Sequence, residues 1–250
     1  MSVPTVFLFS DFGSNGPYVG QVEAVLKANC SANFIDLLND APVTDPFHAS
    51  YLLAAIYRHL PTNDGYLMAV VDPGVGSNRH VVLIRTERMT IIAPDNGLAA
   101  VLANYHNNIA VYRLIERPSS EFVSFHARDW FAPLIANLIN GAEPLVEPIN
   151  VADMVGAQTP DQLHEVIYID HYGNLMTGIQ ADKRNAMTKF QINQYTVVPA
   201  STFSDVPHGE LFWYENSIGL VEIAANSSSA AEIIKARIGD KLYEIDALDI

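Results

Sequence analysis

The chain has 250 residues, nearly half of them apolar, which is enough for one large domain or two modest ones. Acidic residues outnumber basic ones two to one, and the net charge of −14 argues against nucleic-acid binding, which needs clustered lysine and arginine. The single cysteine, Cys30, excludes an internal disulfide and a cysteine-based zinc site. No apolar run approaches the ~20 residues of a membrane span, and the basic start of a signal peptide is missing. We therefore expect a cytoplasmic protein without a membrane partner.

Strands and helices alternate along the first part of the chain. Strand patterns lie at residues 6–9, 34–37, 66–71, 81–84, 90–92 and 109–114, and helical patterns at residues 19–28, 46–60, 98–104 and 126–139. Such alternation is typical of a sheet with largely parallel strands. We predict an N-terminal α/β domain over residues 1–152.

The pattern changes to short strands separated by Gly, Asn and Pro turns in the last third of the chain. These strands are expected at residues 165–169, 175–179, 189–192, 196–198, 211–214, 220–223 and 241–245. This spacing is typical of a compact, mainly antiparallel sandwich or barrel. We predict a linker over residues 153–162 and a C-terminal all-β domain over residues 163–250.

The motif D-P-G-V-G at residues 72–76 directly follows a buried strand, and Arg79 comes seven residues after Asp72. Open α/β sheets place their chemistry at such strand ends. The turn is not a dinucleotide fingerprint, because Arg79 stands where G-x-G-x-x-G needs its third glycine. A nearby guanidinium would keep Asp72 ionised, able to hold a cation or orient a water molecule. A loop salt bridge explains the same spacing equally well.

Two further polar positions adjoin apolar elements. Asp11 follows the first strand, where an aspartate can bind a ribose diol or hydrogen-bond its own turn. His126 precedes an apolar helix, where it can act as a general base or bond the backbone. A metal held by Asp11, Asp72 and His126 is disfavoured, because the sequence has no H-E-x-x-H motif and no cysteine pair.

The motif D-H-Y-G-N at residues 170–174 opens the predicted β domain. The ring of Tyr172 can stack on a purine, and Asn174 offers a donor and an acceptor to a base edge. A hairpin turn also explains the Gly-Asn pair. The sequence has no G-x-S-x-G elbow and no P-loop, so it does not support a serine hydrolase or an NTPase.

These loops, in this order, resemble the S-adenosylmethionine (SAM) hydrolase family, also called SAM hydroxide adenosyltransferases. Its relatives include the SAM-dependent fluorinase and chlorinase. Each motif alone is weak, but their collinear order over about 220 residues is specific. The motifs are S-D-F-G (10–13), P-Y-V-G (17–20), V-D-P-G-V-G (71–76), P-D-N-G-L (94–98), F-H-A-R-D (125–129), D-H-Y-G-N (170–174), N-S-I-G (216–219) and A-N (225–226).

The resemblance implies an N-terminal α/β domain and a C-terminal β domain, assembled as a homotrimer with SAM bound between neighbouring subunits. SAM would be the substrate, and no cofactor is implied. The implied roles are ribose binding by Asp11, binding of the methionine end by Asp170 and Ser217, stacking on adenine by Tyr172, bonding of the adenine edge by Asn174, and a place near adenine for Asn226.

The resemblance also implies that Asp72, Arg79 and His126 activate water or hydroxide. The halogenating relatives carry tyrosine where this chain has Asp72, and the fluorinase has a halide-binding serine where this chain has Ala127. Hydrolysis of SAM at C5′ to adenosine and L-methionine is therefore implied. The alternatives are a non-catalytic module that binds SAM or adenosine and, less favoured, a SAM-dependent halogenase.

The chain departs from the family pattern at three positions. Ala127 stands where the hydrolases usually have glycine, which narrows the pocket for the nucleophile. Thr44 lies near the position of a stacking tryptophan in the fluorinase, and Tyr172 replaces a frequent phenylalanine. The last change keeps an aromatic face, so we expect it to be tolerated.

Overall fold

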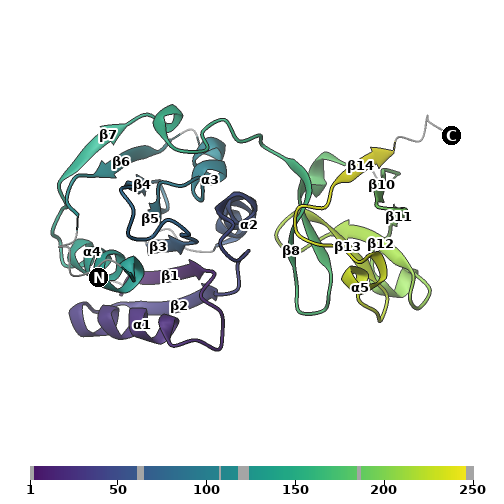
Figure 1. Cartoon of the computed structure of the whole chain (residues 1–250), viewed down its shortest axis with the longest axis horizontal. Coiled ribbons are helices and arrows are strands. Elements are labelled where there is room, and N and C mark those ends of the chain that lie inside the picture. The colour runs from purple at the N-terminus through teal and green to yellow at the C-terminus, as the bar shows by residue number, and fades with distance from the viewer. Residues whose placement is uncertain (1–2, 61–64, 107, 118–123, 185–186, 246–250) are drawn as a thin grey trace. The chain divides into compact units, whose positions relative to one another are not determined.

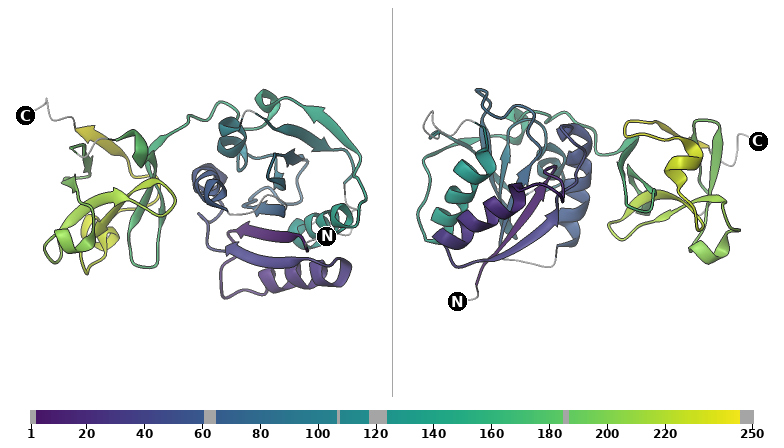
Figure 2. Two further views of the ribbon diagram at one scale, coloured as in Figure 1. Left: turned by 180° about the vertical axis from the view of Figure 1, so that it is seen from behind. Right: turned by 60° about the horizontal axis from the view of Figure 1, so that its bottom comes forward.

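The structure of the chain is a computed structural model that describes residues 3–60, 65–106, 108–117, 124–184 and 187–245. Contacts between Cα atoms divide it into two compact units (Figures 1 and 2). The first unit contains Met1–Leu53 and Leu60–Thr159, and the second contains Ala54–His59 and Pro160–Ile250. No helix in the described ranges combines the length and apolarity needed to span a membrane.

A seven-stranded sheet in the order β2-β1-β3-β5-β4-β6-β7 forms the first unit. Strands β2, β1, β3 and β5 run parallel, whereas β4, β6 and β7 are joined by antiparallel pairing. The predicted α/β class with a largely parallel sheet is confirmed. The strands are β1 (Thr5–Ser10), β2 (Asn33–Leu38), β3 (Gly65–Val70), β4 (Val81–Arg85), β5 (Met89–Pro94), β6 (Ala110–Leu114) and β7 (Val146–Ile149).

The helices of this part of the chain are α1 (Tyr18–Asn29), α2 (Pro46–His59), α3 (Ala100–Tyr105) and α4 (Ala132–Ile139), and the last six residues of α2, Ala54–His59, are grouped with the second unit. Helices α1 and α4 lie side by side, as the right-hand view of Figure 2 shows. Leu26 and Ile135 join a buried cluster with Leu8 and Met68 of the sheet. The chain passes through α1 from β1 to β2, and then through α2 back past β1 to β3. Because such crossovers are right-handed, α1 and α2 lie on opposite faces of the sheet.

This reversal of direction makes β1 and β3 the switch point of the sheet. Asp11 follows the last residue of β1, and Asp72 lies two residues after the end of β3. The backbone N–H of Asp11 donates to the carbonyl of Val70, 3.4 Å away, so the two strand ends adjoin. Ligands of open α/β sheets bind outside the carboxyl ends of the strands at such a point.

The single helix predicted for residues 126–139 is wrong in its first part. Residues Ala127–Phe131 form a π-helix, η1, and α4 begins only at Ala132, whose N–H bonds the carbonyl of Ala127. Pro133 accounts for the change, because its ring has no N–H and would clash with the carbonyl four residues earlier in a regular α-helix. Widened turns of this kind are frequent at functional sites.

The second unit contains a seven-stranded sheet in the order β14-β10-β11-β12-β13-β9-β8, antiparallel except for the pair of β11 and β12. Val166 of β8 exchanges backbone hydrogen bonds with Gly239 and Asp240, just before β14, so the sheet is nearly closed. The predicted all-β, barrel-like domain is confirmed. Its strands are β8 (Leu163–Ile169), β9 (Leu175–Gln180), β10 (Lys189–Ile192), β11 (Tyr195–Pro199), β12 (Leu211–Glu215), β13 (Leu220–Ala225) and β14 (Leu242–Ile245).

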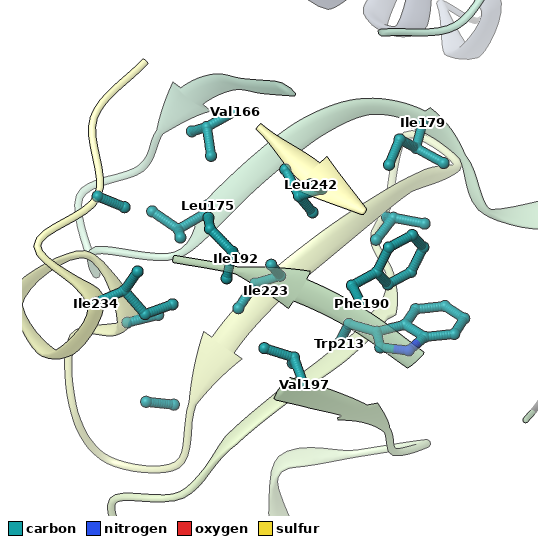
Figure 3. Close-up of a cluster of buried hydrophobic side chains, with 14 of the residues drawn as sticks. Val166, Leu175, Ile179, Phe190, Ile192, Val197, Trp213, Ile223, Ile234 and Leu242 are labelled. Atoms are coloured by element: carbon teal, nitrogen blue, oxygen red, sulfur yellow. The ribbon is translucent and has the colours of Figure 1, made fainter. Parts of the chain in front are cut away.

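Side chains from most of these strands fill the interior of the second unit. Phe190 and Trp213 pack edge to face there, with ring centroids 5.4 Å apart, beside Leu175, Ile223 and Leu242 (Figure 3). One short helix, α5 (Ala230–Ile234), covers part of this core. The remaining single turns of 3₁₀-helix are η2 (Val151–Asp153), η3 (Ala181–Lys183) and η4 (Phe203–Asp205).

Candidate active site

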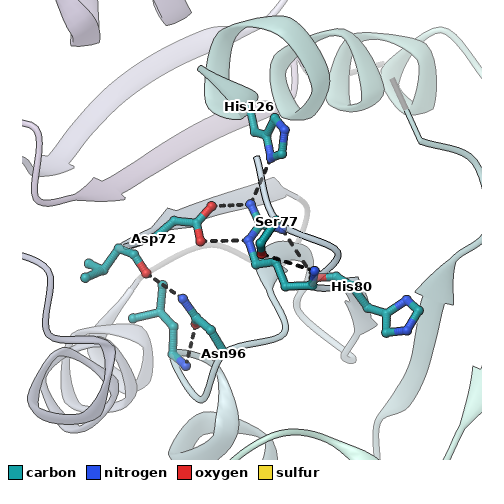
Figure 4. A network of polar contacts seen from close by, with 8 residues as sticks. Asp72, Ser77, His80, Asn96 and His126 are labelled. Carbon is teal, nitrogen blue, oxygen red and sulfur yellow. Dashed lines mark hydrogen bonds and ion pairs between the residues drawn. The ribbon is translucent and has the colours of Figure 1, made fainter. Parts of the chain in front are cut away.

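A buried ion pair joins Asp72 and Arg79, as their spacing suggested. Arg79 Nε donates to Asp72 Oδ1 at 2.7 Å, and Arg79 Nη2 donates to Asp72 Oδ2. The side chains are only 4% and 8% exposed, and the backbone N–H of Arg79 donates to Ser77 Oγ at 3.3 Å within the same turn (Figure 4). A bidentate ion pair in so dry a place holds the carboxyl group in one orientation.

His126 lies against the same guanidinium. Its Nδ1 is 3.0 Å from Arg79 Nη2, across 47 residues of sequence (Figure 4). Arginine is always a donor, so Nδ1 must accept, and the neutral ring then carries its proton on Nε2. Burial of the ring, and next the charge of Arg79, lower the pKa of His126 below its ordinary value of 6.5. The geometry and the pKa direction both indicate a neutral His126 at pH 7.

Asp72 and His126 form part of the wall of a small cavity of about 100 Å³ at the switch point of the sheet. The cavity is lined by Asp11, Phe12, Thr44, Val70, Asp72, Val75, Ser124, Phe125, His126 and Ala127. Arg79 is absent from this lining, although it contacts both Asp72 and His126. Asp72 and His126 can therefore touch a ligand in the cavity, while Arg79 acts through them.

Asp11 supports an unusual backbone conformation at the same cavity. Its Oδ2 accepts the N–H of Thr44 at 2.8 Å, and Thr44 has a φ of +56°, in the left-handed region that non-glycine residues rarely adopt. Burial raises the pKa of Asp11, and the charge of Asp72 raises it further against the bond from Thr44. Asp11 thus has a structural contact of its own, and its side chain also lines the cavity.

A second, larger cavity of about 860 Å³ lies in the second unit. The residues that the family resemblance assigns to adenine and to the methionine end of SAM all line it: Asp170, Tyr172, Asn174, Ser217 and Asn226. Tyr172 is 76% exposed, so a face of its ring is open for stacking. A cavity of this size is within the range that holds a drug-sized ligand.

Asp170 organises the loop that carries Tyr172. Its Oδ1 accepts the backbone N–H groups of Tyr172 at 2.9 Å and Asn174 at 2.8 Å, and its Oδ2 accepts Asn174 Nδ2 at 3.0 Å. Asn226 has both ends of its amide occupied, donating to Val206 O and accepting from Ser227 Oγ. The turn interpretation of this motif therefore holds at Asp170, in addition to its place at the cavity.

The sequence assigned no role to five polar lining residues: Tyr214, Asn216, Glu222, Ser227 and Ser228. Glu222 is only 2% exposed and accepts from the Tyr214 hydroxyl and from Asn216 Nδ2, the latter at 2.9 Å. The signal available in the sequence was a lone glutamate in the apolar run L-V-E-I-A-A of β13. A glutamate in a fully buried strand is rare unless hydrogen-bonding or charged partners offset its removal from water.

Metal ligation has no support at either cavity in the described part of the chain. Nowhere in the residues that the structure describes do three His, Cys, Asp or Glu side chains gather closely enough to hold a metal ion. The smaller cavity brings together the Asp72 carboxyl group and a neutral imidazole, and one guanidinium contacts both.

Comparisons with known proteins agree over nearly the whole chain. Residues 6–147 match the SAM hydroxide adenosyltransferase N-terminal domain, and residues 164–243 match the corresponding C-terminal domain. Two relatives, from Thermus thermophilus and Salinispora arenicola, are named (R)-S-adenosyl-L-methionine hydrolase. They are 32% and 29% identical, over 94% and 96% of this chain and 96% and 97% of their own lengths.

Solved structures show the same arrangement of elements. A conserved hypothetical protein from Thermus thermophilus, 30% identical, superposes with a TM-score of 0.77 over 98% of this chain and 100% of its own. An uncharacterized conserved protein from Thermotoga maritima, 26% identical, gives a TM-score of 0.78 over 97% and 100%. The two domain matches and the relatives together show that the chain belongs to the SAM hydroxide adenosyltransferase family.

Proposed function

We propose that this chain hydrolyses SAM to adenosine and L-methionine, with Asp72, Arg79 and His126 handling the attacking water. The observation that carries the proposal is the contact of Arg79 with both Asp72 and His126 at the wall of one cavity. Membership of the family and the hydrolase relatives support the same substrate and reaction.

The reaction sets a simple chemical task. A bond forms between the water oxygen and C5′ of the ribose while the C5′–S bond breaks, and its electron pair goes to sulfur. The leaving group is the neutral thioether of methionine, so it needs no proton, whereas the attacking water must lose one. The site therefore has to align the water with the C5′–S bond and accept or release a proton.

Asp72 is the better acceptor for that proton. The neutral His126 already carries a proton on Nε2, and its Nδ1 accepts from Arg79, so it can take a proton only after breaking that contact. Asp72 orients the water by accepting its hydrogen bond, and Arg79 keeps Asp72 ionised. His126 donates from Nε2 and fixes the position of the nucleophile.

The remaining assignments follow the two cavities. Asp11 binds the ribose hydroxyls, Tyr172 stacks on adenine, and Asn174 bonds the adenine edge. Asp170 and Ser217 hold the methionine end, and Asn226 lies near the adenine. A homotrimer with SAM bound at its subunit interfaces completes the proposal. The single cysteine is compatible with a reducing compartment, and we place the enzyme in the cytoplasm.

Incubation of the purified protein with SAM, followed by chromatography and mass spectrometry, tests the activity. Equal amounts of adenosine and methionine are expected, with the same yield when chloride or fluoride is added. Binding of SAM without any product would make the chain a non-catalytic module. A 5′-halo-adenosine in the halide samples would make it a halogenase.

A further inference from the structure

The larger cavity contains a buried carboxyl group, that of Glu222, to which the proposed reaction gives no role. Glu222 lies on β13 directly opposite Tyr214 of β12, and both line the cavity. The Tyr214 hydroxyl donates to Glu222 Oε1, and Asn216 Nδ2 donates to Oε2 at 2.9 Å. The residue as a whole is 2% exposed, so its charge is almost completely removed from water.

The hydrogen bonds indicate that Glu222 is ionised in this arrangement. The oxygen of the Asn216 amide already accepts the backbone N–H groups of Ile218 and Leu220, so its nitrogen faces Glu222. Burial and the contact with Glu222 raise the pKa of Tyr214, so its hydroxyl keeps the proton that it donates to Glu222 Oε1. Both carboxylate oxygens thus face donors, which a protonated carboxyl would not require.

Glu222 shares the cavity with Asp170, whose two oxygens also accept hydrogen bonds from N–H groups. Burial raises the pKa of Glu222, and the charge of Asp170 raises it by a smaller amount, as expected when two like charges face one cavity. The lining of this cavity, drawn from the described residues, contains no lysine, arginine or histidine to offset them. The two carboxylates therefore favour a ligand that brings positive charge.

We infer that Glu222 is a specificity-determining residue that selects the sulfonium form of the ligand over neutral thioethers. The inference rests on the proposed function. SAM carries two positive groups, an ammonium and a sulfonium, and the cavity offers two carboxylates. The ammonium is assigned to Asp170, which leaves Glu222 for the sulfonium. Displacement at C5′ converts the sulfonium into a neutral thioether, so the attraction to Glu222 is lost when the products form, and their release becomes easier.

Binding of two unreactive analogues tests this inference by calorimetry. Sinefungin carries an amine cation in place of the sulfonium, and S-adenosylhomocysteine carries a neutral sulfur there. The wild-type protein is expected to bind sinefungin at least about tenfold more tightly, the order of a unit charge in a partly screened site. E222Q should remove most of that preference by weakening sinefungin alone. With SAM, E222Q should raise KM about tenfold and leave kcat unchanged or higher. The attraction that the substitution removes stabilises the bound, positively charged substrate and does not grow in the transition state.

Two control variants separate charge from structure. E215Q removes an exposed carboxylate from β12, the strand paired with β13, and should keep the wild-type preference. Y214F leaves the carboxyl group of Glu222 and its bond from Asn216 in place, so at alkaline pH, where that carboxyl is ionised, it should also retain a preference for sinefungin. Loss of the preference in Y214F to the same extent as in E222Q would overturn the inference in favour of a structural role.

The two affinities of the wild-type protein can contradict the inference even if E222Q does not fold. Equal affinity of the wild-type protein for the two analogues would overturn the inference, and so would an unchanged preference in E222Q. Turnover of SAM together with equal affinities would leave the proposed function standing. Absence of both turnover and analogue binding would contradict the proposed function and the inference together.

Discussion

At the scale of single residues, the charge of Asp72 carries the proposed catalysis. We expect D72N to lower kcat by about 100-fold or more, the range for loss of a proton acceptor, with sinefungin affinity changed by less than about threefold. The amide keeps the size of the side chain but cannot accept a proton or form the ion pair with Arg79. Steady-state kinetics and calorimetry measure the two effects. D36N, an exposed change on β2, is the matched control, and equal turnover in both variants would remove Asp72 from the mechanism.

His126 should control the acid limb of the pH profile. Burial and the charge of Arg79 depress its pKa below 6.5, so the neutral form persists as pH falls through 6.5 and is lost only at lower pH. Because the pKa of His126 is lower in the folded protein than in the unfolded one, the neutral ring favours folding at any pH above the unfolded-state pKa. That contribution to stability is lost as the pH falls through the folded-state pKa. We expect kcat/KM to be constant down to pH 6.5 and to decrease only at lower pH, where His126 becomes protonated. A limb at or above 6.5 would show that the imidazole is not held neutral.

Part of this site could be predicted from the sequence. The seven-residue spacing of Asp72 and Arg79 after a buried strand indicated either a salt bridge or a site, and the structure shows the ion pair beside a cavity. The contact of His126 with Arg79 could not be predicted from local pattern, because 47 residues separate them. Glu222 was missed for a different reason: its donors are near in sequence but reach it only through the pairing of β12 with β13 and the turn between them.

At the scale of elements, Gly173 ties the loop of Tyr172 to the start of α5. It has a φ of +81°, and an added Cβ would overlap the Ser229 side chain, which caps α5 by accepting Glu232 N at 3.1 Å. Gly209 has a similar φ of +82°, but a Cβ there would meet nothing within 4 Å. The two glycines therefore separate backbone strain from steric overlap.

We expect G209A to cost about 1–2 kcal/mol, the left-handed strain alone, and G173A to cost about 1–3 kcal/mol more because of the overlap. Chemical denaturation measures both. G173A should also weaken sinefungin binding, because the loop that carries Tyr172 has to move. Equal stability of the two variants would show that the loop yields without penalty.

Regular elements could be predicted better than irregular ones. The long apolar patterns gave the strands and helices of both units to within a few residues. The π-helix before α4 could not be read from periodicity, although Pro133 inside the pattern was a warning. Strand β7 was missed because it is short and contains Pro148, which is tolerated at a sheet edge. Helix α5 has only one local signal, the S-A-A-E capping pattern at residues 229–232.

At the scale of the whole molecule, the proposed homotrimer predicts a solution mass of about three times 27.5 kDa, the mass of one chain. Light scattering coupled to size-exclusion chromatography measures it. Activity per chain should fall when the protein is diluted below the concentration at which the trimer dissociates. A monomer that retains full activity would contradict the assembly, while leaving the residue roles at each cavity open to the tests above.

Attack of water at C5′ is the central claim, and reaction of SAM in ¹⁸O-labelled water tests it most directly. Mass spectrometry of the products should find one ¹⁸O atom in adenosine, at the 5′ position, and none in methionine, because the new oxygen–carbon bond forms only at C5′. Methylthioadenosine in place of adenosine, or adenosine without label, would show that another bond is broken or that another nucleophile attacks, and would contradict the account.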